Sequence, residues 1–170
     1  VGPDDVVEVK KSVLDKEPLY LAYNKPVGVL THSAGEGEQD IAGAIAPLLK
    51  GQLHGAKLFP IGRLDKDSHG LIILTNDGRI TGKLLDPEEH HEKVYIVETK
   101  NRLSNNFEML MHRGVVIQDD EGKKYKTKPC QVKMLGDKKF SITLTEGKKR
   151  QIRRMCEVCG AEVTDLERVR

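Results

Sequence analysis

Residues 62–78 read GRLDKDSHGLIILTNDG, a polar loop bounded by glycines that runs into a short apolar stretch. The loop carries the carboxylate of Asp65 directly after an arginine and a leucine. Residues 71–75 lack polar alternation, so we expect a strand that is buried on both faces. A loop that holds an acid in one pose at the end of a sheet would be built in this way. Asp65 is therefore the first candidate for a catalytic residue.

Strand and helix patterns surround this loop without a regular repeat. Strands are expected over residues 19–23, 71–75, 93–97, 115–117, 130–135 and 140–144. Helices are expected after caps at Asp40 and Ser104, over residues 79–85, and from about residue 149 to 159, with Pro47 splitting the first. The first would carry Leu48 on its apolar face, and the helix after Ser104 would carry Leu110. Strands outnumber helices and do not follow a βαβ rhythm. The sequence therefore predicts an α+β fold with a mixed, mostly antiparallel sheet.

Length and composition narrow the class of protein. The 170 residues suit a single domain that buries a core without disulfides. An odd number of cysteines, three, argues against a disulfide framework and favours a reducing compartment, so we expect a cytoplasmic protein. Its longest apolar run is far too short to cross a bilayer, and we expect no membrane partner.

A cluster of basic residues near the C-terminus is the strongest charge feature. Five cations fall within seven positions: Lys148, Lys149, Arg150, Arg153 and Arg154. Apolar residues at helical spacing in the same segment place Arg153 beside the buried stripe and turn Arg150 and Arg154 toward solvent. Such density indicates a phosphate-binding surface, with Arg153 able to reach a buried acid. A solvated basic helix face is the alternative.

Other chemistry-bearing residues have simpler interpretations. Cys156 and Cys159 form a Cys-x-x-Cys pair, but both lie on the apolar stripe of the last helix, so we expect core packing rather than redox or metal chemistry. His69 is a lone loop histidine, and His90 and His91 lack the spacing of metal ligands. The sequence therefore predicts no metal site.

Four segments in order resemble the RNA pseudouridine synthases. They are residues 24–28, 62–78, 92–97 and 146–157. The resemblance is greatest to the branch that contains the RsuA, RluB, RluE and RluF enzymes of ribosomal RNA, and residues 166–170 favour the RluF type. It extends over residues 19–170. It implies a pseudouridine synthase fold, in which helices flank the sheet around a central active-site cleft.

The resemblance also assigns roles to individual residues. Asp65 would be the essential aspartate that attacks or deprotonates the ribosyl uracil of a flipped-out nucleotide. Tyr95 would lie beside the detached base, and Arg153 would pair with Asp65 and keep it ionised. Arg63 would fill the gap that the flipped uridine leaves. Contacts to the RNA backbone would come from Lys25, Arg150 and Arg154. No metal and no organic cofactor is implied.

The implied activity is isomerisation of a specific uridine to pseudouridine in 23S ribosomal RNA by a monomer. Residues 1–10 would be a tail, the end of an N-terminal RNA-binding domain, and residues 11–170 a catalytic domain that is truncated at its C-terminal end. Alternative substrates are 16S ribosomal RNA and tRNA. A non-catalytic RNA-binding module and a carboxylate hydrolase are alternatives of another class, and the hydrolase would need a second acid, for which Asp67 lies nearest.

Overall fold

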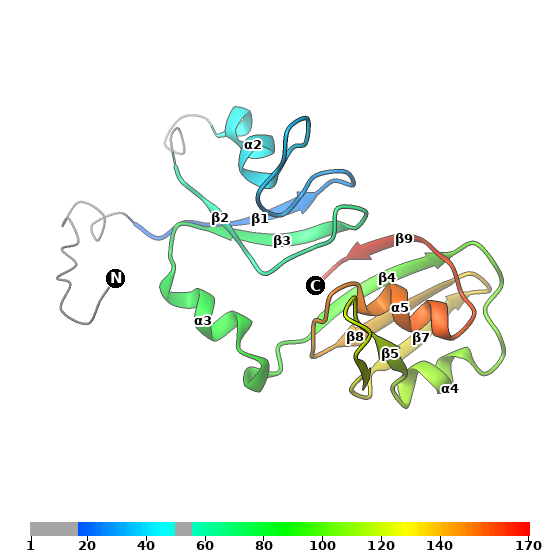
Figure 1. The fold of residues 1–170 in the computed structure, drawn as a ribbon. Helices are drawn as coiled ribbons and strands as arrows, with labels where there is room; N and C mark the ends of the chain where they lie inside the picture. The colour runs from blue at the N-terminus through cyan, green and yellow to red at the C-terminus, as the bar shows by residue number, and fades with distance from the viewer. Residues whose placement is uncertain (1–16, 50–55) are drawn as a thin grey trace.

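The computed structural model describes residues 17–49 and 56–170, and a single seven-stranded sheet dominates it (Figure 1). Its strand order is β1-β3-β9-β4-β8-β7, with β2 paired to β3. The strands are β1 (Tyr20–Lys25), β2 (Phe59–Ile61), β3 (His69–Thr75), β4 (Lys93–Thr99), β7 (Gln131–Gly136), β8 (Lys139–Leu144) and β9 (Val163–Arg168). A separate hairpin contains β5 (Val116–Gln118) and β6 (Lys124–Lys126). The predicted tail, residues 1–10, lies outside the described residues.

The sheet consists of two halves that meet at the start of β3. β3 pairs with β9 in parallel through two residue pairs, His69 with Glu167 and Gly70 with Arg168. The other pairings between described strands are antiparallel. The predicted α+β fold with a mixed, mostly antiparallel sheet is therefore confirmed. Because residues 62–68 lead directly into β3, the loop with Asp65 lies at this junction.

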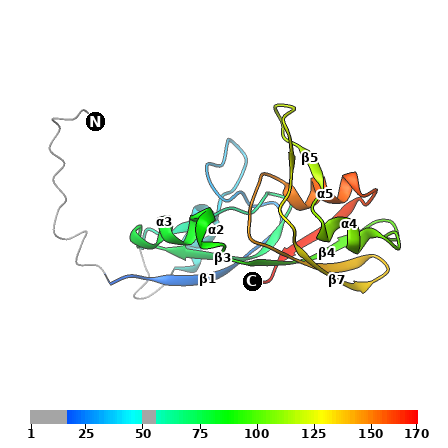
Figure 2. The same ribbon diagram turned by 90° about the horizontal axis from the view of Figure 1, so that it is seen from below.

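Short helices cover parts of the sheet, and Figure 2 shows α4 and α5 on the same side of it. The helices are α2 (Ile41–Ile45), α3 (Arg79–Leu85), α4 (Phe107–His112) and α5 (Gln151–Val158), with 3-10 turns η1 (Ala46–Leu48) and η3 (Pro87–Glu89). The Asp40 side chain accepts a hydrogen bond from the Gly43 amide at 2.9 Å, which confirms the predicted cap. Pro47 lies in η1, so the first helix is split as predicted.

Much of the core lies between α4, α5 and the inner face of the β4–β8 half, and the same buried cluster includes residues of α2 and β3. Ile152, Met155 and Cys156 of α5 are all buried, which confirms the predicted apolar stripe. The rings of Phe107 in α4 and Phe140 in β8 pack edge to face with centroids 4.9 Å apart. This packing fixes α5, and with it the basic cluster, against the sheet.

Two sequence expectations about burial were wrong. β3 is buried on one face only, because Ile72 and Leu74 are at most 1% exposed while Ile73 is 39% exposed. Leu48 and Leu110, expected on buried helix faces, are exposed as well. The sequence pattern also missed β2, which is short, and β9, which is rich in charged residues. In residues 17–49 and 56–170, no helix has the length and apolar character needed to cross a membrane.

Candidate active site

The segment after β1 clamps the loop that carries Asp65. The buried hydroxyl of Thr31 donates to the Leu64 carbonyl at 2.7 Å and accepts from the Leu64 amide at 3.1 Å. The Gly28 amide donates to the Lys66 carbonyl at 2.8 Å. These bonds join two segments that are more than thirty residues apart in sequence. The loop is therefore held on both sides of Asp65 by backbone groups whose hydrogen bonds are satisfied.

A tight turn then presents Asp65. The Ser68 amide donates to the Asp65 carbonyl at 3.1 Å, and Ser68 is 1% exposed. Asp65 itself is half-buried, whereas Arg63 two residues earlier is exposed. An exposed Arg63 is free to meet a nucleic acid, as its predicted role requires, and that role stays a prediction.

Lys25 does not fit its predicted role as a contact to the RNA backbone. Its side chain is fully buried, and its ammonium donates to the carbonyls of Pro26 at 2.9 Å and Val29 at 2.7 Å. Burial lowers the pKa of Lys25, and the charges of Asp65 and Asp67 oppose that shift. Lys25 is therefore a buried cation that holds the segment after β1, within range of the charges of Asp65 and Asp67.

The resemblance implied that Arg153 pairs with Asp65, but in the structure Arg153 pairs with Asp67. Its Nε lies 3.3 Å from Asp67 Oδ2, an ion pair without hydrogen-bond alignment. Its Nη2 donates to the backbone carbonyl of Asp67 at 2.7 Å. Arg150 forms a bidentate pair with the same carboxylate at 3.0 and 2.9 Å. Asp67 thus ties the start of α5 to the Asp65 loop.

The charge state of Asp67 follows from these partners. Partial burial works to raise its pKa, but the hydrogen bond from Arg150 and the charges of Arg153 and Arg150 outweigh burial and lower it. Asp67 is therefore ionised at neutral pH. Arg150 also lies within range of the Asp65 charge, as Lys25 does, so two cations act on the loop carboxylate.

Replacing Asp67 by asparagine is expected to lower the free energy of unfolding by about 1 kcal/mol at neutral pH, because the pair is partly exposed to solvent. A carboxyl group with a lowered folded-state pKa stabilises the fold above its unfolded pKa. That contribution is lost as the pH falls through the folded value. Urea unfolding of both proteins should therefore show a gap at neutral pH that narrows as the pH falls below the unfolded pKa of an aspartate, about 3.9. Asp137→Asn, at an exposed pair with Arg102, serves as the control and should change stability by less than about 0.5 kcal/mol.

Arg154 was predicted to face solvent, and this prediction was wrong. The β5–β6 hairpin packs against α5, and the guanidinium of Arg154 donates to the Gln118 carbonyl at 2.5 Å and pairs with Asp120. Its side chain is only 15% exposed. Lys149 reaches the same Asp120 carboxylate at 2.5 Å. The acidic tip of the hairpin therefore neutralises part of the basic cluster, and a phosphate would have to compete with Asp120 for these two cations.

Tyr95 of β4 lies within range of the Asp65 charge. It is 9% exposed, and its pKa is raised first by burial and further by Asp65, while the neighbouring Arg168 works against that rise. Residues 65 and 95 come from separate halves of the sheet, so the tertiary fold brings them together. The hydroxyl of a largely buried tyrosine needs a polar partner, and here the charged neighbours are Arg168 and Asp65.

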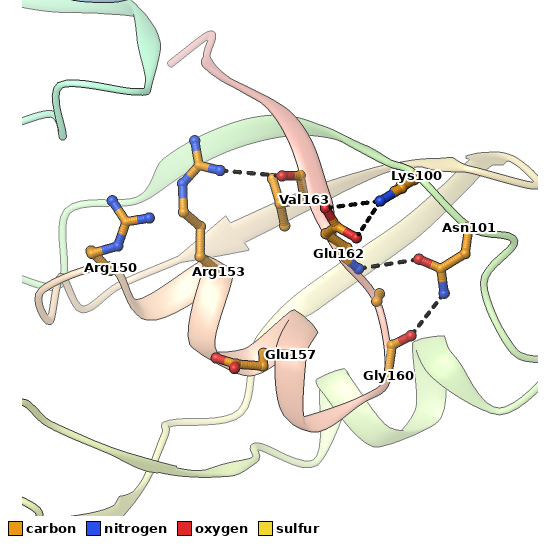
Figure 3. A pocket seen from close by; sticks show the side chains of 9 residues that line it. Lys100, Asn101, Arg150, Arg153, Glu157, Gly160, Glu162 and Val163 are labelled. Carbon is orange, nitrogen blue, oxygen red and sulfur yellow. Dashed lines mark hydrogen bonds and ion pairs between the residues drawn. The ribbon is translucent and has the colours of Figure 1, made fainter.

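An open hollow of about 660 Å³ borders this region (Figure 3). Arg150 and Arg153 project from α5 on one side of it, while Lys100 and Glu162 form an ion pair at 3.1 Å on the other. Asp65 is not among its lining residues. Cations on the rim of an open hollow suit an anionic polymer better than an enclosed small molecule. Within the described part of the chain, no group of three potential metal ligands is present.

Two functional candidates had been missed or left without a role by sequence reasoning. Asp67 had been considered only as a second acid for a hydrolase, although it is the partner of both Arg150 and Arg153. Arg168 had only been part of a resemblance, although it lies beside Tyr95. Because β9 is rich in charged residues, no local signal distinguishes Arg168. Nothing local in the sequence indicates which cation Asp67 would meet.

Comparison with known proteins agrees with this geometry. A family model described as RNA pseudouridylate synthase matches residues 19–158. The chain is 41% identical over 174 residues to the dual-specificity RNA pseudouridine synthase RluF of Escherichia coli (strain K12), which covers 100% of this chain and 56% of RluF. It is 32% identical over 175 residues to ribosomal large subunit pseudouridine synthase B of Bacillus subtilis (strain 168), covering 99% of this chain and 68% of that protein.

A solved structure supports the same assignment. The crystal structure of a pseudouridylate synthase matches with a TM-score of 0.76 at 31% identity, covering 89% of this chain and 62% of that chain. The chain thus spans little more than half the length of RluF. Family model, full-chain relatives and fold agree, and the chain belongs to the RNA pseudouridine synthase family.

Proposed function

We propose that this chain is the catalytic part of an enzyme that isomerises a uridine of 23S ribosomal RNA to pseudouridine, with Asp65 as its essential carboxylate. The observation that carries the proposal is the placement of Asp65 in a clamped turn, within charge range of Tyr95, Lys25 and Arg150. Membership of the family supports the reaction class. The large-subunit name of the Bacillus subtilis relative supports the choice of RNA.

The reaction breaks the glycosidic C–N bond, turns the free uracil and forms a C–C bond, so no atom is added or lost. A carboxylate near the sugar can act as nucleophile or base. Lys25 and Arg150 carry their positive charges within range of this carboxylate. Tyr95 provides an aromatic wall and a hydroxyl for proton transfer at the base. These side chains suffice for the chemistry, which implies no cofactor.

Recognition of the RNA would use the cations around the loop. Arg63 is exposed on the loop itself, where it can fill the stack from which the uridine is flipped. Arg150 is 40% exposed and rims the hollow beside α5, where a phosphate can share it with Asp67. Because these contacts are ionic, affinity should fall steeply with salt concentration. Arg154 can take part only if the RNA displaces Asp120.

The direct test is to incubate the protein with transcripts of 23S rRNA, 16S rRNA and tRNA and to map pseudouridine chemically on each. The proposal expects conversion of a specific uridine in the 23S transcript. Conversion confined to 16S rRNA or tRNA would refute the choice of substrate but keep the reaction. Salt-sensitive binding to all three transcripts without any conversion would instead favour a non-catalytic RNA-binding module.

A further inference from the structure

Arg168 lies at the point where the two halves of the sheet meet. It pairs in register with Tyr95 on one side and with Gly70 on the other. Residues that are directly opposed in neighbouring strands project from the same face, so the guanidinium and the phenol are cross-strand neighbours. Arg168 is 9% exposed, and a buried guanidinium is costly unless its donors are satisfied. The burial of a charged side chain at this junction therefore indicates a specific role for Arg168.

Part of that explanation is the contact between Arg168 and β3. Its Nε donates to the Leu71 carbonyl at 2.5 Å, which adds a side-chain bond to the short parallel pairing of β3 and β9. That bond uses one of the five donors of the guanidinium and orients its plane. The remaining donors are available to the neighbour across the strand, Tyr95. Burial lowers the pKa of Lys93, two residues before Tyr95 in β4, and the positive charge of Arg168 lowers it further.

We propose that Arg168 is a positioning residue for the reaction, which acts through the hydroxyl of Tyr95. A guanidinium can only donate hydrogen bonds, so the phenolic oxygen must accept from it. The hydroxyl proton then points away from Arg168 and is available to a group other than the guanidinium. Burial raises the pKa of Tyr95, and the charge of Arg168 and a hydrogen bond from it work against that rise. The cation also makes the phenol a better proton donor than burial alone would leave it.

The inference rests on the proposed function, because it needs a reaction in which Tyr95 takes part. A positioning role for Arg168 differs from a purely structural role in one measurable respect. A structural residue affects the rate whether or not position 95 carries a hydroxyl. A residue that acts through that hydroxyl loses its effect when the hydroxyl is removed, so the two substitutions are non-additive.

The test is a double-mutant cycle on single-turnover rates of pseudouridine formation. Arg168→Lys keeps the charge in place but loses the planar fork, and it should lower the rate by about tenfold when Tyr95 is present. In the Tyr95→Phe background the same substitution should cost less than about twofold. Affinity for the RNA should stay within about twofold in all variants. Arg170→Lys, at an exposed arginine on the same segment that pairs with Glu92, is the matched control and should leave the rate unchanged.

Equal penalties for Arg168→Lys in both backgrounds would overturn the inference. Rates are compared at a temperature where urea unfolding shows each variant to be folded, and a second cycle with Arg168→Gln repeats the comparison without the charge. Asp65→Asn separates this inference from the proposed function. An active Asp65→Asn enzyme defeats the proposed function, whereas an inactive one together with additive Arg168 and Tyr95 penalties defeats only the role of Arg168.

Discussion

Replacement of Asp65 by asparagine is expected to lower pseudouridine formation by at least about 1000-fold, as for other residues that act directly on the bond being broken. The amide has nearly the same size as the carboxylate, but it can neither attack the sugar nor take up a proton. The turn around residue 65 is closed by backbone bonds and by the Thr31 clamp, and these do not involve the Asp65 side chain. Thermal and urea unfolding should therefore change little.

The measurement is chemical mapping of pseudouridine on the transcript that the wild-type protein modifies, together with the affinity for that transcript. Asp137→Asn removes an exposed carboxylate and should retain full activity. Binding of the RNA by Asp65→Asn should be equal or tighter, since a negative charge near the phosphates is removed. Activity within tenfold of wild type would exclude Asp65 as the essential group. The catalytic carboxylate would then have to be another residue.

Replacement of Gly70 by alanine is expected to lower the free energy of unfolding by about 3 to 5 kcal/mol, the sum of backbone strain and overpacking. Gly70 has a φ of +104°, which side chains rarely adopt. A Cβ built there would lie 2.2 Å from the carbonyl oxygen of Arg168 and 2.7 Å from its nitrogen. Those contacts are to backbone, so the strands β3 and β9 would have to separate at the junction of the two halves of the sheet.

Urea unfolding followed by circular dichroism measures this loss. Gly82→Ala is the matched control, because Gly82 lies in α3 at an exposed position with nothing within 4 Å of a new Cβ. That substitution should instead stabilise the protein by about 0.5 to 1 kcal/mol. A loss below about 1 kcal/mol for Gly70→Ala would mean that the junction yields easily, and that Arg168 and Tyr95 are held less firmly than proposed.

The sequence by itself determined most of the local structure. The Asp40 cap, the split at Pro47, the alternation in β8 and the apolar stripe of α5 all depend on neighbours within a few residues, and the structure has each of them. The same holds for the candidate loop, since its glycines and polar residues set a turn before an apolar strand whatever lies around it. The burial of β3 was the exception, because apolar composition does not tell which face a neighbouring element covers.

Only the tertiary structure decided which charges meet. Arg150 reaches Asp67 across 83 residues, and Arg168 reaches the Leu71 carbonyl across 97. Lys25 is buried and Arg154 is covered by a hairpin, although both were expected to be free for RNA. A charged side chain has several oppositely charged candidates in any sequence, and the register of distant strands selects among them. Local pattern thus marked Asp65 as a candidate and the family resemblance gave it a role, whereas the charged and aromatic groups within its range, Lys25, Tyr95 and Arg150, depend on how the two halves of the sheet join.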